Sequence, residues 1–164
     1  MKWIMMILLF AGCLLAGYLY SSRYKKRVDL FTSLIYFAQK LDVEINFSRE
    51  RLKKLVEDFD SKSKSNLQGI DTAFLQYLNN GGELTTDSLF GKKNLIKKEE
   101  KETVAMFFKN LGRSDVENQT KEIKNSISRF EKLQNEAMAE YKKYGKLGIK
   151  LGIIAGLALI VILI

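Results

Sequence analysis

The acidic side chains are the residues of this sequence whose spacing could support acid–base chemistry. Asp58 and Asp60 lie two residues apart, and the run 97–102 reads Lys-Lys-Glu-Glu-Lys-Glu. Paired carboxylates act as general acid and general base when their surroundings separate their pKa values. Here lysines alternate with the carboxylates of the 97–102 run, a mixture that is typical of a solvated charged face. We therefore assign no catalytic pair.

Other common catalytic and ligand-binding patterns are absent from the sequence. There is no histidine, and the single cysteine, Cys13, lies inside an apolar run. A Ser-His-Asp triad, a zinc-binding His-Glu-x-x-His helix and a disulfide within the chain are thereby excluded. Gly91 precedes two lysines but lacks the upstream glycine and the hydroxyl residue of a phosphate-binding loop. We predict a protein that is not an enzyme, with no cofactor, no metal and no small-molecule substrate.

Positive charge is concentrated next to the apolar ends of the chain. The sequence has 27 Lys and Arg residues against 19 Asp and Glu residues, a formal net charge of +8. All the acidic residues lie between Asp29 and Glu140. The basic residues at the apolar ends are Lys2, Arg23, Lys25, Lys26, Arg27, Lys142, Lys143, Lys146 and Lys150. Without them the interior is nearly neutral, so no nucleic-acid partner is expected.

Each end of the chain is apolar and long enough to cross a bilayer. Residues 3–20 carry no charge, and 18 residues of helix extend about 27 Å, close to the thickness of the hydrocarbon core. Residues 147–164 carry one charge, Lys150, whose long side chain can reach back to the headgroups. We predict an N-terminal transmembrane anchor over 1–22, a helical domain over 23–146 and a C-terminal transmembrane helix over 147–164.

The basic borders also predict an orientation. Lys and Arg are enriched on the cytoplasmic side of membrane helices, so we expect the middle domain in the cytoplasm and both termini outside. Two alternatives compete. Residues 10–13, Phe-Ala-Gly-Cys, resemble a lipoprotein cleavage site, and an apolar segment can also be a buried core helix. The apolar run continues past Cys13 and the C-terminal segment has no polar face, which favours two retained anchors.

Three glycines recur at every fourth residue of the C-terminal segment. Gly148, Gly152 and Gly156 would lie on one face of a helix, where the absence of side chains lets another helix approach closely. Such a partner could be the N-terminal segment. Because glycine is common in membrane helices, a neutral background is the competing interpretation.

The spacing of apolar residues predicts an all-α middle domain, a cytoplasmic helical bundle between the two membrane helices. We expect helices over about 23–46, from Ser48 to Phe59, from Asp71 or Thr72 to Leu78, around Leu89, and over about 96–111. The run 61–66, Ser-Lys-Ser-Lys-Ser-Asn, is typical of a solvated linker. An apolar seam from Val116 to Gly148 then predicts one long helix that continues towards the C-terminal anchor, with Gly145 or Gly148 as its point of irregularity.

The segment before this long helix combines a helix stop with a helix start. Gly112 is placed to end one helix, and the run 114–117, Ser-Asp-Val-Glu, has the form of a capping box with Ser114 as N-cap. A partner contact is the alternative role. The candidate residues for capping or partner contact are Gly112, Arg113, Ser114, Asp115, Asn118 and Gln119.

The same segment carries a family resemblance. The runs 111–115 (Leu-Gly-Arg-Ser-Asp), 118–119 (Asn-Gln) and 143–146 (Lys-Tyr-Gly-Lys), followed by Gly152 and Gly156, resemble the stage III sporulation protein AB family. The resemblance covers the chain from anchor to anchor. It departs from the family at 47–50 (Phe-Ser-Arg-Glu), where a proline-containing helix entry is usual.

This resemblance implies a function that composition and periodicity do not reveal. It implies a membrane platform or scaffold in a secretion-like channel complex between mother cell and forespore, similar to platform proteins of type II secretion and type IV pili. The implied partners are other channel-complex membrane proteins and a cytoplasmic secretion-type ATPase, and the implied location is the mother-cell membrane around the forespore. The alternatives are a membrane-tethered structural or division-associated protein unrelated to secretion, and an enzyme with carboxylate chemistry.

Overall fold

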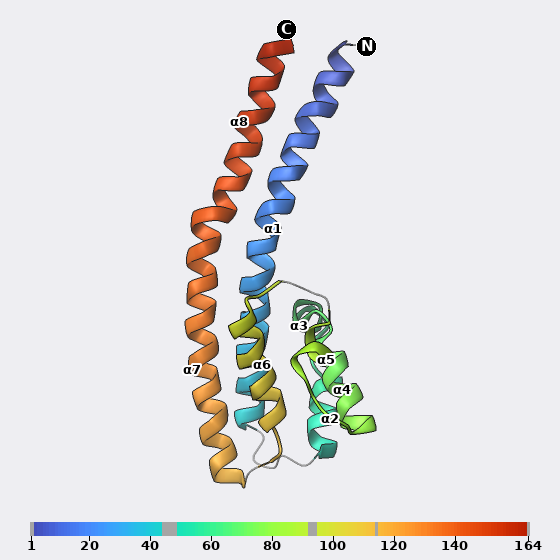
Figure 1. Cartoon of the computed structure of the whole chain (residues 1–164), viewed down its shortest axis with the longest axis vertical. Helices are drawn as coiled ribbons and strands as arrows, with labels where there is room; N and C mark the ends of the chain where they lie inside the picture. Colours follow the sequence, from blue (N-terminus) through green and yellow to red (C-terminus); the bar gives the residue numbers. More distant parts are fainter. Residues whose placement is uncertain (1, 44–48, 92–94, 114, 164) are drawn as a thin grey trace. The chain divides into compact units, whose positions relative to one another are not determined.

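The computed structural model describes residues 2–43, 49–91, 95–113 and 115–163, which form a series of helices (Figure 1). The first helix, α1, spans Lys2–Val43. Four shorter helices follow: α2 (Arg49–Glu57), α3 (Ser61–Leu67), α4 (Ile70–Asn80) and α5 (Thr86–Phe90). The chain continues with α6 (Lys98–Asn110), α7 (Val116–Glu140), the π-helical turn η1 (Tyr141–Gly145) and α8 (Lys146–Leu163).

The chain forms two compact units. The terminal unit comprises Met1–Val28 and Asn135–Ile164, and the middle unit comprises Asp29–Gln134. Both α1 and α7 contribute residues to each unit. The membrane borders expected after residue 22 and before residue 147 stay predictions, because no bilayer defines them.

In the terminal unit, the first part of α1 lies beside α8 (Figure 1). The helical stretches Trp3–Val43 and Val116–Ile162 are each long and apolar enough to cross a membrane. Large apolar side chains on both helices point outward, for example Trp3 at 74% and Ile154 at 62% exposure. Water would disfavour so much exposed apolar surface, whereas lipid accepts it. This arrangement is consistent with the two membrane anchors predicted from the sequence.

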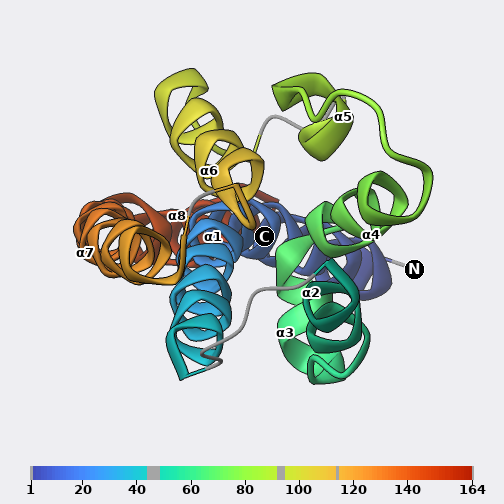
Figure 2. The same ribbon diagram turned by 90° about the horizontal axis from the view of Figure 1, so that it is seen from below.

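The middle unit is held together by aromatic side chains. Within it, α4 contacts α2, α3 and α5, and α5 contacts α6 (Figure 2). Phe37 of α1 lies at the centre, with its ring 5.3 Å from that of Phe59 and 5.6 Å from that of Phe108 on α6. Phe108 in turn lies 4.8 Å from Phe74 of α4. Edge-on and tilted ring pairs at these distances stabilise a core beyond the area that they bury.

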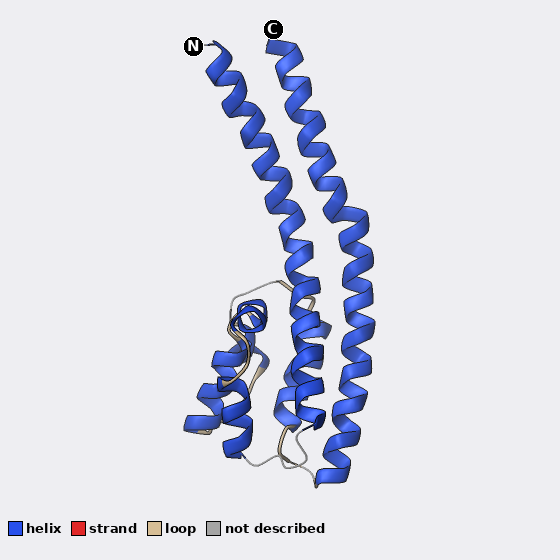
Figure 3. Ribbon diagram, turned by 180° about the vertical axis from the view of Figure 1, so that it is seen from behind, coloured by secondary structure: helices blue, strands red, loops and turns tan. Residues whose placement is uncertain are grey.

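No strand occurs among the described residues, which confirms the all-α fold (Figure 3). α4 extends two residues beyond the expected end at Leu78 and has Gly81 as its C-cap, and a short helix surrounds Leu89 as expected. Gly112 follows α6 with a φ of 76°, a left-handed conformation that suits glycine after a helix end. Ser48, the expected start of the second helix, lies outside the described residues.

The linker predicted over residues 61–66 is wrong, because these residues belong to α3. The side chain of Asp60 accepts a hydrogen bond from the Ser63 backbone N–H at 2.9 Å and so caps the helix. At the other end Leu67 is buried in the middle unit. The alternation of serine and lysine concealed a short helix that is stabilised by one cap and one buried side chain.

The long C-terminal helix is continuous but not uniform. Its irregularity is the π-helical turn η1, which ends at Gly145, one of the two positions expected from the sequence. A methyl group on Gly145 would lie 2.5 Å from the ring of Tyr141, so a larger residue would force that ring to move. π-helical turns are a recognised cause of irregular helix geometry.

Candidate functional site

Small residues line the contact between α1 and α8. A methyl group on Gly152 would lie 2.8 Å from the Cys13 carbonyl oxygen, and one on Gly17 would lie 2.7 Å from the Gly148 carbonyl oxygen. These distances are too short for a side chain, so the two backbones touch. Close backbone contact through glycine is a typical way for helices to pack in lipid.

The structure thus places Gly148, Gly152 and Gly156 against the N-terminal segment of the same chain. A methyl group on Gly156 would meet the ring of Phe10, and one on Gly148 would meet the ring of Tyr20. Sequence reasoning missed Gly17, the residue of α1 that contributes to this contact. Cys13, Gly17 and Ser21 are small residues at every fourth position, and this spacing could have indicated the contact face of α1.

An ion pair lies at one end of the terminal unit. Arg27 is 5% exposed, and its guanidinium donates a hydrogen bond to the Glu140 carboxylate, which also forms a salt bridge with it. From the sequence, Arg27 belonged to a basic border with no partner assigned. Glu140 is the last acidic residue before the C-terminal anchor, and this position could have indicated that it pairs with a basic residue of the border.

The segment 112–119 connects α6 to α7 through one buried side chain. Gln119 is 1% exposed, and its Oε1 accepts a hydrogen bond from the Gly112 N–H at 2.8 Å. The helix α7 opens with a bond from the Gln119 N–H to the Asp115 carbonyl oxygen at 2.9 Å. Ser114 lies outside the described residues, so its capping role stays a prediction.

The other candidates in this segment lie at the surface. Arg113, Asp115 and Asn118 are exposed, whereas Gln119 is not. Gln119 therefore serves to join two helices, while the partner contact expected of the three exposed residues stays a prediction.

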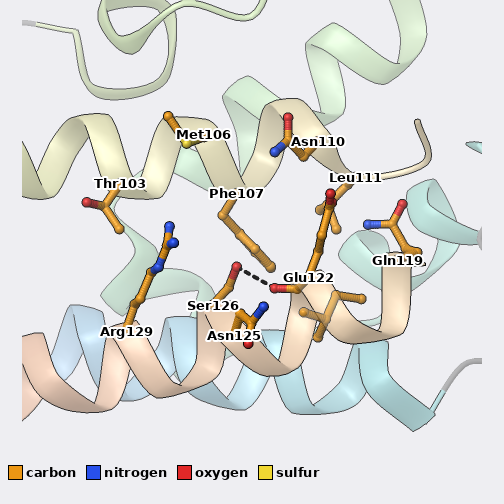
Figure 4. A pocket seen from close by; sticks show the side chains of 11 residues that line it. Thr103, Met106, Phe107, Asn110, Leu111, Gln119, Glu122, Asn125, Ser126 and Arg129 are labelled. Carbon is orange, nitrogen blue, oxygen red and sulfur yellow. Dashed lines mark hydrogen bonds between the residues drawn. The ribbon is translucent and has the colours of Figure 1, made fainter. Parts of the chain in front are cut away.

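A groove between α6 and α7 lies next to this segment in the middle unit (Figure 4). Its volume is about 220 Å³. Phe107 points from α6 towards α7, and Arg129 extends from α7 towards Thr103 of α6. Met106, 56% exposed, adds an apolar surface at the groove, and the Ser126 hydroxyl donates to the Glu122 carbonyl oxygen at 2.8 Å.

The lining of this groove mixes apolar, amide and charged groups, a composition that suits a protein contact. Among the described residues, no group of three or more His, Cys, Asp or Glu residues could hold a metal ion. Sequence reasoning did not single out the groove, because it forms only where two helices that are separated by a turn lie side by side.

Comparison with known proteins places the chain in a family. The family model described as stage III sporulation protein AB matches residues 2–164. No curated protein and no solved structure matches the chain.

Proposed function

Because the chain belongs to the stage III sporulation protein AB family, we propose that it is a non-enzymatic membrane platform in a secretion-like channel complex between mother cell and forespore. Family membership gives the chain a role related to sporulation. The platform role extends this, on the resemblance of the family to platform proteins of type II secretion and type IV pili.

The observation that carries the proposal is the pair of helical connections between the two units. α1 supplies residues to both units, and so does the stretch formed by α7, η1 and α8. A platform must hold its partner-binding domain close to the membrane and transmit force between them. Two helical connections serve that purpose better than one flexible tether, since a helix resists bending.

The partners in this proposal are other membrane proteins of the channel complex and a cytoplasmic secretion-type ATPase. The protein would lie in the mother-cell membrane around the forespore, with the middle unit in the cytoplasm and both termini outside, following the basic borders. The groove between α6 and α7 and the exposed residues Arg113 and Asn118 would supply the contact surface.

Co-purification from sporulating cells tests this role. Tagged full-length protein should recover channel-complex membrane proteins and the ATPase. Arg129→Ala, in the groove, should reduce recovery of a partner, whereas Lys124→Ala should not, because helical spacing puts Lys124 about 200° around α7 from Glu122 in the groove. Recovery of division proteins without channel components would instead support the membrane-tethered structural alternative.

A reporter that is active only in the cytoplasm tests the orientation. The loop after α4 suits the insertion, because a side chain on Gly82 would meet no atom within 4 Å. The reporter should be active there and inactive when fused after Ile164. The opposite result would reverse the proposed topology.

A further inference from the structure

A second groove, in the terminal unit, runs along one side of the α1–α8 pair. Its volume is about 370 Å³. The α1 side is formed by Cys13, Ala16 and Tyr20, and the α8 side by Leu147, Leu151 and Ala155. Because the interface glycines have no side chains, the floor of the groove is backbone. The lining is apolar, and its two helices are those that can cross a membrane.

Both walls of this groove end in a basic residue. On α1, Arg23 follows Ala16 and Tyr20 at the spacing i, i+4, i+7, so the three share one helix face. On the other wall, Lys143 precedes Leu147 and Leu151 at steps of four residues. Arg23 and Lys143 are both exposed. The groove is therefore apolar along its length and positively charged at one end.

Tyrosine side chains lie at the same end of the groove. The ring of Tyr20 covers Gly148, and the hydroxyls of Tyr20 and Tyr24 are 3.1 Å apart. The ring of Tyr144 lies 6.0 Å from that of Tyr24, and the Lys143 ammonium lies 5.1 Å from the centre of the Tyr144 ring. Phenol hydroxyls and cations together suit a phosphate group at a membrane surface.

We propose that this groove binds an anionic phospholipid. An acyl chain lies against Ala16, Leu151 and Ala155, and the phosphate lies beside Arg23 and Lys143. Charge complementarity favours this occupant over a helix of a partner, because an apolar helix needs no cations at the end of its groove. The electrostatic potential at this end of the groove is positive, because Glu136 and Glu140 are the acidic residues of the terminal unit and Glu140 is paired with Arg27.

Lipid retention by the full-length protein in an uncharged detergent tests the proposal. Phosphatidylglycerol and phosphatidylcholine with identical acyl chains are added, and bound lipid is counted by native mass spectrometry. Phosphatidylglycerol should be retained in preference. The double variant Arg23→Gln/Lys143→Gln should weaken its binding about twenty-five-fold, since each basic residue near an anionic headgroup contributes roughly a factor of five.

A matched control removes the same charge from other positions. Lys25→Gln/Lys142→Gln changes two exposed basic residues, and Lys25 lies about 200° around α1 from Arg23. This control should retain most of the phosphatidylglycerol. Equal loss in the two double variants would show general attraction to anionic lipid and would overturn the site.

A substitution that fills the groove distinguishes a bound lipid from the other possible occupants. Ala16→Ile leaves every charge in place and should lower phosphatidylglycerol retention without changing the oligomeric mass. A lower oligomeric mass with unchanged lipid retention would identify a helix, from a partner or a second copy, as the occupant and would overturn the proposal. Inorganic phosphate alone should not raise the melting temperature, and an increase equal to that given by the lipid would also overturn it.

Discussion

The two units differ in the residues at their closest helix contacts, which are glycines in one unit and phenylalanines in the other. In the terminal unit Gly17, Gly148, Gly152 and Gly156 are buried in the contact between α1 and α8, while tryptophan, isoleucine and leucine side chains face outward. In the middle unit the buried contact consists of phenylalanines such as Phe37 and Phe108, which are at most 1% exposed, while charged residues cover the outside.

The surroundings predicted for each unit, lipid for the terminal unit and water for the middle unit, explain this difference. In water, transfer of a large apolar side chain out of solvent is strongly favourable, so the largest side chains form the core. In lipid that gain disappears, and helices associate through close backbone packing, which small residues allow. The same chain therefore follows two packing rules, and each rule can be tested by a substitution that violates it.

The largest effect is expected at Phe37, the centre of the aromatic core. Phe37→Ala should destabilise the protein by about 3–5 kcal/mol, because a buried phenylalanine leaves a cavity that the surrounding helices cannot fill. Chemical denaturation of the full-length protein, followed by circular dichroism, measures this. Met106→Ala, at an exposed residue of the same unit, should change stability by no more than about 0.5 kcal/mol. Similar losses for the two variants would contradict a core centred on Phe37.

In the terminal unit, adding a side chain rather than removing one should be destabilising. Gly152→Val adds a side chain where even a methyl group would lie 2.8 Å from a backbone oxygen, and overpacking of this kind costs about 1–3 kcal/mol.

Formation of an engineered disulfide measures whether α1 and α8 are in contact. The β-carbon of Gly156→Cys would lie 3.5 Å from that of Cys13, so the two should cross-link on oxidation.

Adding Gly152→Val to the Gly156→Cys variant should abolish this cross-link. Ala155→Val, on the exposed side of α8, is the matched control and should preserve it. A cross-link that survives Gly152→Val would mean that backbone contact does not set the distance between the helices.

A smaller effect is expected where a polar side chain joins two helices of the middle unit. Gln119→Ala removes the acceptor for the Gly112 N–H and should cost about 1–2 kcal/mol, as for other partly buried donors left without a partner. Asn118→Ala, at the exposed neighbouring residue, should have almost no effect on the melting temperature. If Asn118→Ala impairs recovery of partners while Gln119→Ala mainly lowers stability, the contact and structural roles are separated within one segment.

The smallest effect is a pH dependence of α3. The hydrogen bonds from the Ser63 side chain and then from its backbone N–H lower the pKa of Asp60 below its ordinary 3.8. The cap is therefore fully present above that pH and is lost as the pH falls through the lowered pKa. The Ser63 amide resonance should titrate in this range in NMR spectra. Asp60→Asn keeps a capping oxygen without a titrating group, so its Ser63 resonance should not move with pH.

Much of the fold could be predicted from the sequence because its signals are local. Residues 3–20 carry no charge and residues 147–164 carry one, so each stretch predicts a membrane helix without any knowledge of neighbours. Helix ends at Gly81 and Gly112 also follow from local geometry, since glycine adopts a positive φ at little cost. The short helix α3 was missed because its stability depends on the burial of Leu67, which is a tertiary contact.

The sequence by itself determined that this protein is helical, that its two ends are apolar and long enough to cross a membrane, and that its basic residues gather at the borders of these ends. Only the tertiary structure decided that Gly17 is the counterpart of Gly148 and Gly152, that Arg27 pairs with Glu140, and that Gln119 accepts a bond from Gly112. Periodicity shows which face of a helix is buried, but it carries no information about which residues lie opposite that face, whether they are 7 positions away, as for Gly112 and Gln119, or 113, as for Arg27 and Glu140.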